Sequence, residues 1–334
     1  MAVYRIFPEK DTTIWSKPTT AGLYANAGLD EILEIRSYLD DDGIGRSSRI
    51  LLKFKDREIN SALSTKVSGP YSASIHLYVA YASEIPKEYT LNAHPISSSW
   101  DNGTGKLEDN PVNRTGVNWR YRNSGDTNEW NNLGGDLITG SYDASKSFDL
   151  KSNLDLDIDV TSFVDAVTSG SIENNGQAIK LADNLEFETT SSITLQYFGV
   201  DTNTVFPPYM EFKWDDSSFN SSLDELSTDI ATISIKNQKE KYIDSDKTRF
   251  RISARPKYPA RAFTTSSIYL TEYKLPQDTY WAIKDEYSDE MIIDFDENYT
   301  KVSADDTSSY FDVYMDSLQP ERYYRLLLKT SIGG

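Results

Sequence analysis

The strongest constraint on the fold is an alternation of apolar and polar residues that recurs along most of the chain. Ile75, Leu77 and Val79 fall at every second position, which places their side chains on one face of an extended strand. The same period of two recurs in residues 193–197, 210–214, 250–254, 291–295 and 311–315. These patterns predict β-strands as the dominant element and an all-β fold class.

Turn-forming residues separate the predicted strands, as in the Asp-Asn-Gly run at 101–103. One segment has helical spacing instead, with apolar residues at Val160, Phe163, Val164 and Val167. Gly170 is placed to end that run, so we predict a single short helix there. The polar stretch 223–230 is as consistent with an ordered linker as with a second helix.

The length of the chain predicts two domains. Its 334 residues exceed the roughly 250 to 300 residues at which a single core stops growing. A polar stretch at 215–222 follows Trp214 and can bury little surface. We therefore predict a jelly-roll-like β-sandwich over residues 1–215, a linker over 216–228, and an immunoglobulin-like β-sandwich over 229–334.

The composition argues against several kinds of chemistry. The chain has no Cys and only two His, so disulfides, thiol nucleophiles, zinc sites and His-dependent triads lack the residues they need. It contains no phosphate-binding loop and no nucleophile elbow. Carboxylates are numerous, but no spacing singles out a catalytic pair. We therefore expect a protein that is not an enzyme and has no cofactor.

Charge and hydropathy narrow the range of partners. A formal net charge of −18 opposes binding to nucleic acid by the protein as a whole. The first residues lack the basic and apolar regions of a secretion signal, and no run approaches the roughly 18 apolar residues of a membrane span. The sequence predicts a soluble protein that is made in a cytoplasm and binds neither nucleic acid nor membrane.

Several segments taken together carry a family resemblance. They are residues 49–54 with Ile59, 74–79, Trp100, Trp119, 159–164, 175–180, 193–198 and 207–212. Over residues 10–215 the chain resembles the DNRLRE-type β-sandwiches, in which these segments are the opening strands, two tryptophans, a short helix and the closing strands. That family is similar to carbohydrate-binding modules, so the resemblance implies a β-sandwich.

A second resemblance concerns residues 1–8 and 11–14, together with 258–261 and 319–324. These segments are similar to structural proteins of large tailed bacteriophages, including T4-like marine phages. The resemblance implies a virion protein of the tail, neck, baseplate or capsid surface, made in the host cytoplasm. It also implies docking to other virion proteins, with several copies on the particle. Such proteins often continue beyond the last strand, so we expect the final hairpin to be missing or to be completed by a neighbour.

Three residues form a candidate calcium site: Asp101, Asn102 and Glu108. Their oxygen atoms lie near a tight turn, and hard oxygen donors are what Ca²⁺ prefers. The spacing is not that of an EF-hand. An ordinary Asn-Gly turn that closes a loop explains the same residues and is the favoured interpretation.

The loop-like segment 92–146 contains several aromatic residues. Trp119, Tyr121 and Trp130 suit a flat platform on which sugar rings stack, with Asn and Asp nearby for the hydroxyl groups. A host-surface carbohydrate-binding module is therefore the alternative function. The same rings also suit a small core inside the loop, which is the commoner outcome for tryptophans in loops.

Between residues 247 and 261 the chain carries six basic residues and no acidic one. Period two places Phe250 and Ile252 in the core, so the neighbouring cations lie on the opposite face. The basic stripe that we predict for docking to another subunit consists of Arg249, Arg251, Arg255 and Arg261. Neutralisation within the sheet, by acids such as Asp294 and Asp312, is an equally open alternative.

Overall fold

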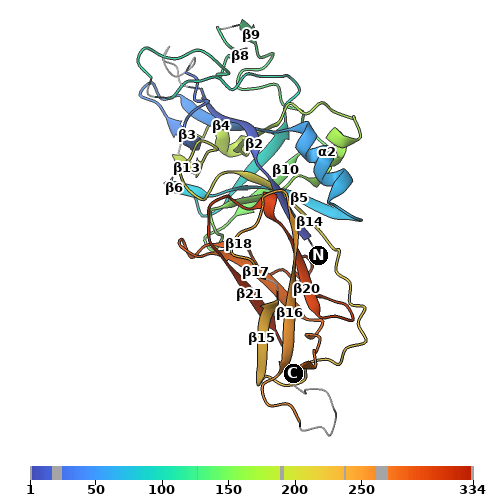
Figure 1. Ribbon diagram of the computed structural model, residues 1–334. Helices are drawn as coiled ribbons and strands as arrows, with labels where there is room; N and C mark the ends of the chain where they lie inside the picture. Colours follow the sequence, from blue (N-terminus) through green and yellow to red (C-terminus); the bar gives the residue numbers. More distant parts are fainter. Residues whose placement is uncertain are drawn as a thin grey trace. The chain divides into compact units, whose positions relative to one another are not determined.

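The computed structural model describes residues 2–16, 25–107, 109–125, 127–188, 192–236, 238–260 and 270–331. The chain is built mostly from antiparallel β-sheets (Figure 1), so the all-β prediction is confirmed. It forms two compact units. The N-terminal unit consists of Ile6–Ser64 and Ser72–Glu211, and the C-terminal unit consists of Met1–Arg5, Thr65–Tyr71 and Phe212–Gly334.

The strands between residues 2 and 214 form three sheets. The largest has eight strands in the order β10-β7-β12-β4-β3-β13-β6, with β2 paired to β4. Its strands are β2 (Pro8–Trp15), β3 (Ile32–Leu39), β4 (Gly45–Phe54), β6 (Val79–Ser83), β7 (Tyr89–Pro95), β10 (Ala144–Phe148), β12 (Gln177–Leu181) and β13 (Ile193–Phe198). A four-stranded sheet has the order β1-β14-β5-β11, formed by β1 (Ala2–Ile6), β14 (Tyr209–Trp214), β5 (Tyr71–Leu77) and β11 (Leu156–Asp159). The third pairs β8 (Tyr121–Asn123) with β9 (Thr127–Glu129).

The alternation around Ile75 extends across two strands that belong to different sheets. Strand β5 ends at Leu77 and β6 begins at Val79. At this break the backbone N–H of Val79 donates to Oδ1 of Asp155 at 2.8 Å, so a side chain replaces the strand partner. Beyond the break the pattern no longer indicates burial, because Tyr81 is 55% exposed.

The described residues include the helices α2 (Asp56–Thr65), α3 (Thr161–Thr168) and α4 (Asp183–Glu186). Helix α3 confirms the predicted helix and buries Phe163 and Val164. Helix α2 was not predicted, since it buries only Ile59 and Ala62. Residues 223–230 contain no helix. None of the helices in the described part of the chain is long and apolar enough to cross a membrane.

The described residues of the C-terminal unit form two further sheets. One has the order β15-β16-β20-β19, with β15 (Ala231–Lys236), β16 (Lys247–Pro256), β20 (Ser309–Tyr314) and β19 (Ser303–Ala304). The other has the order β18-β17-β21, with β18 (Met291–Ile293), β17 (Thr279–Asp285) and β21 (Tyr324–Thr330). A short 3₁₀ helix, η2 (Met315–Ser317), follows β20.

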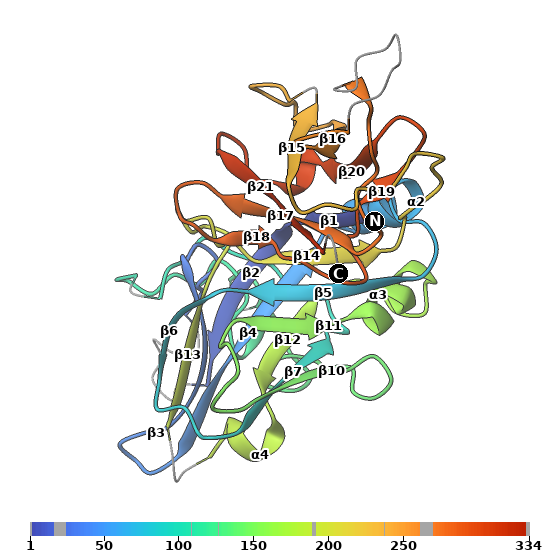
Figure 2. The ribbon, with the colours of Figure 1, turned by 90° about the horizontal axis from the view of Figure 1, so that it is seen from below.

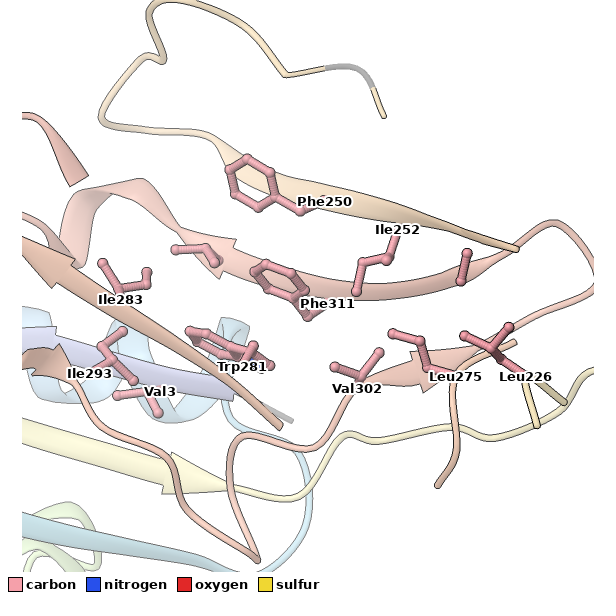
Figure 3. Close-up of a cluster of buried hydrophobic side chains, with 12 residues drawn as sticks. Val3, Leu226, Phe250, Ile252, Leu275, Trp281, Ile283, Ile293, Val302 and Phe311 are labelled. Carbon is pink, nitrogen blue, oxygen red and sulfur yellow. The ribbon is translucent and has the colours of Figure 1, made fainter. Parts of the chain in front are cut away.

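A cluster of aromatic and aliphatic side chains fills the core of this unit (Figure 3). Phe311 of β20 stacks on Trp281 of β17 at 5.0 Å and on Phe250 of β16 at 5.4 Å between ring centroids. All three rings are buried. Val3 of β1 belongs to the same core, which explains why the first residues of the chain are part of this unit.

Candidate functional site

The predicted basic stripe lies on β16, with its cations on the face opposite the core. Phe250 and Ile252 are buried, whereas the side chain of Arg249 is 45% exposed and that of Arg251 is 23% exposed. This arrangement follows from the two-residue period of the strand. Arg261 lies outside the described residues.

Two of the arginines are paired within the sheet. Arg249 donates to both carboxylate oxygens of Asp312, at 2.8 and 3.0 Å, and Arg251 donates to both oxygens of Asp305, at 3.0 and 2.9 Å. Tyr310 lies beside both guanidinium groups, with its ring centroid 4.0 Å from Cζ of Arg249 and 5.5 Å from that of Arg251. Such bidentate pairs are strong and directional. These two cations are therefore not free to bind an acidic partner without first breaking an internal contact.

The other predicted members of the stripe have different surroundings. Arg255 donates from Nη1 to the carbonyl oxygen of Pro256 at 3.3 Å. Asp294, one of the two acids expected to neutralise the stripe, accepts from the backbone N–H of Phe295 at 2.7 Å. Asp305, which follows β19, is the second acid in contact with the stripe. Asp305 reaches Arg251 only because the turn at 305–308 lies next to β16. No local pattern in the sequence predicts that these two segments are neighbours.

The Arg251–Asp305 pair predicts a loss of stability in acid. The Arg251 guanidinium holds the pKa of Asp305 well below its ordinary 3.8, so the stabilisation is present above about pH 4 and is lost as the pH falls below that. When the pH is lowered from 5 to 2.5, we expect the free energy of unfolding to fall by about 1 kcal/mol less in Asp305→Asn than in the wild type. The expected difference is this small because a third of the Asp305 side chain is exposed to solvent. Urea denaturation of both proteins at pH 5 and at pH 2.5 measures this difference. An equal fall in unfolding free energy for the two proteins would show that the Arg251–Asp305 pair does not stabilise the fold.

The C-terminal unit is closed along one side by a segment that passes from one sheet to the other. Trp281 N–H donates to Thr300 O at 2.9 Å, and Val302 N–H donates to Thr279 O at 2.7 Å, so this segment pairs with β17. The next residues form β19 and pair with β20. Strand β21 pairs with β17 along its full length, and β16 pairs with all six residues of β20. The closing segment therefore lies on the sides of β17 and β20 that face away from β21 and β16.

In the described part of the chain, the opposite side of the unit is open. Within the described residues β15 pairs only with β16, and β21 pairs only with β17. Beyond the closing segment, the first sheet has three strands in the order β20, β16 and β15. The second sheet has only two, β17 and β21, among the described residues. As far as the chain is described, the second sheet therefore has no strand opposite β15. Figures 1 and 2 both show β15 and β21 on the same side of the unit.

Burial along the two edge strands agrees with this count. None of the residues of β15 or β21 is buried. Ile233 and Ile235 are opposite Ala254 and Ile252, so they point toward the core, yet Ile233 is 37% exposed. Leu326 and Leu328 are the inward residues of β21 and are only partly buried. The position beside β21 and opposite β15, where no described residue forms a strand, is called the open strand position below.

The tryptophans proposed as a sugar platform lie inside the N-terminal unit. Trp119 and Trp130 are 5% and 3% exposed and belong to a small core beneath the long loop. The indole N–H of Trp130 donates to the carbonyl oxygen of Asn118 at 3.0 Å. Tyr121 is half-buried at the start of β8, with the Arg120 guanidinium 5.5 Å from its ring centroid. Stacking on a sugar needs exposed ring faces, and the two tryptophans do not provide them.

The candidate calcium residues form the local contacts of a folded loop. Asp101 accepts from the backbone N–H of Ser124 at 3.3 Å, and the Asn102 amide donates to the carbonyl oxygen of Gly28 at 2.8 Å. Glu108 is not among the described residues. In the part of the chain that the structure describes, no group of three or more His, Cys, Asp or Glu side chains is arranged to hold a metal ion.

A buried charge cluster in the N-terminal unit was not found from the sequence. Glu186 of α4 lies 2.5 Å from Arg49 of β4 and 2.6 Å from Lys180 of β12, measured between the charged atoms. All three residues are less than 10% exposed. Arg49 also donates to Gly134 O at 2.8 Å, and its guanidinium lies 5.0 Å from the Trp119 ring centroid. The cluster ties two strands, a helix and the long loop together, and its satisfied hydrogen bonds are those of a structural element.

No protein-family model matches this chain, and no curated protein matches it. The resemblances of single segments to known families therefore remain hypotheses.

Proposed function

We propose that the protein is a non-enzymatic structural component of a bacteriophage particle that attaches to other virion proteins through its C-terminal unit. The docking part rests on the open side of this unit, where the outer edges of β15 and β21 have no strand partner among the described residues. Unpaired edge N–H and C=O groups are a template for another chain. The assignment to a phage particle is supported by the resemblance of residues 1–8, 258–261 and 319–324 to phage structural proteins.

We infer further that the C-terminal unit is immunoglobulin-like. Its sheets have the strand orders of the A-B-E-D and C′-C-F parts of such domains. Trp281 is buried on the strand equivalent to C. The Tyr324 hydroxyl, at the start of the strand equivalent to F, donates to Gln319 O at 2.9 Å, which is the arrangement of a tyrosine corner. Rigid units of this kind serve as spacers and docking modules, which supports the proposed role.

The paired arginines change which surface is favoured for docking. Because Arg249 and Arg251 already bind Asp312 and Asp305, an acidic partner gains little from them. Among the residues that the structure describes, the open side has incompletely buried aliphatic side chains and strand edges without a partner. Covering both is favourable, so we place the attachment there. Several copies on one particle would each present the same surface.

The virion assignment is tested by asking whether the protein is part of the particle. We expect phage particles purified from an infected host by density gradient to contain the chain in a fixed ratio to the major capsid protein, as measured by quantitative mass spectrometry. The ratio should not change when the particles are washed in high salt. A chain that stays in the soluble fraction of the lysate, or that is washed away, would contradict the proposal.

A further inference from the structure

We propose that the open strand position accepts an extended segment of another protein, in which aliphatic residues alternate with acidic ones. This inference rests on the proposed function, because the segment would belong to a neighbouring virion protein. It adds the mode of binding, which is the addition of a strand to the free edge of β21, and the chemistry of the segment.

The side chains on the inward face of the open strand position determine which residues the bound segment needs at its inward-facing positions. Leu326 and Leu328 on β21 and Ile235 on β15 point toward the core and are partly buried, and Ile233 on the same face of β15 is 37% exposed. An added strand has side chains on alternate faces, so every second residue would pack over these four aliphatic groups. Aliphatic residues at those positions complete the core. A polar residue there would be buried without a partner.

The outward-facing side chains of β21 determine which residues the bound segment needs at its outward-facing positions. The outward residues of β21 are Arg325, Leu327 and Lys329, and both cations are exposed. Arg325 is bound to Glu286 at 2.8 Å, whereas Lys329 is opposite the uncharged Tyr280. Because Arg325 already binds Glu286, an acidic residue on an added strand would gain most across from Lys329, and opposite charges on neighbouring strands are favourable. A basic strand would be repelled.

The same cations disfavour a second copy of the chain at this edge. If two β21 strands paired antiparallel about Leu327, Arg325 of each copy would be opposite Lys329 of the other. Like charges that are directly opposite each other destabilise a strand pair. Basic residues on an edge strand are a known means of preventing such self-association. The position therefore discriminates between an acidic strand and a copy of itself.

Binding of synthetic peptides to the full chain tests the proposal. The probe is a capped peptide of alternating Val and Glu, and the matched controls are alternating Val and Lys, and a shuffled peptide with the Val and Glu residues in blocks. We expect the Val-Glu peptide alone to slow amide hydrogen exchange in residues 324–330 by tenfold or more. Absence of protection, equal protection by all three peptides, or protection confined to other segments would overturn the proposal. Protection that appears with protein concentration alone would indicate a second copy and would also overturn it.

A charge reversal provides the sharper control. Lys329→Glu should weaken binding of the Val-Glu peptide by about tenfold and allow the Val-Lys peptide to bind. Lys151→Glu makes the same change of charge at an exposed position in the N-terminal unit and should leave both affinities unchanged. If Lys329→Glu and Lys151→Glu behave alike, strand recognition by charge is wrong. The presence of the protein in particles is measured separately, so this inference can fail while the proposed function stands.

Discussion

Replacing Glu186 by Ala should lower the free energy of unfolding by about 3 to 5 kcal/mol, because the substitution leaves the buried Arg49 guanidinium without a counterion and Lys180 with the exposed Asp183 alone. Glu186 contacts Arg49 at 2.5 Å and Lys180 at 2.6 Å, and the exposed fractions of the three residues are 3%, 8% and 3% respectively. A buried charge has lost its hydration, and this cost is offset only by its ion pair and hydrogen bonds. When the counterion is removed, the desolvation cost remains and the offset is lost. Urea denaturation at pH 7, followed by tryptophan fluorescence, measures the change.

Asp183 supplies a matched control on the same lysine. Its carboxylate also lies 2.6 Å from Nζ of Lys180, but its side chain is 92% exposed. An ion pair in which one partner is solvated contributes little, so Asp183→Ala should cost at most about 1 kcal/mol. If the two substitutions reduced stability by similar amounts, burial of the cluster would not be the source of its importance.

The strands could be predicted because the period of two is a local property of the sequence. The segments around Leu195, Phe212 and Phe250 are strands with these side chains buried. The break at Tyr78 was missed because alternation continues across it, although β5 and β6 lie in different sheets. Helix α2 was missed because it buries only Ile59 and Ala62, too few apolar residues to reveal a helical period.

Prediction of the candidate site was limited by strand order. Period two gave the outward direction of Arg249, and Asp312 was correctly named as a neutralising acid. Asp305 and the cluster around Glu186 depend on which segments become neighbours in space, and no local pattern contains that information. The open side is likewise a property of two sheets with different numbers of strands. Only the strand order shows that, among the described residues, no strand of the second sheet lies opposite β15.

Asp11→Asn should raise the free energy of unfolding at pH 8 by up to about 4 kcal/mol, which makes it the largest stabilisation that we expect. Burial raises the pKa of Asp11 from its ordinary 3.8 to about 7, and the nearby charge of Asp201 adds to the shift. The carboxyl group is packed against Gly199, where a Cβ would lie 2.9 Å from Oδ2, and it accepts from Val200 N–H at 2.7 Å. Asn keeps an acceptor for that N–H and cannot ionise.

The direction of the pH dependence follows from proton binding. Between about pH 4 and 7 the folded protein holds a proton on Asp11 that the unfolded chain has released, so this group makes stability fall as the pH rises through that range. A shift of about three pKa units corresponds to about 4 kcal/mol. Asp11→Asn should therefore match the wild type near pH 4 and exceed it increasingly up to pH 7, with a constant difference above that. The exposed Asp41→Asn is the control and should change stability only slightly. Parallel curves for Asp11→Asn and the wild type would show that Asp11 is ionised throughout.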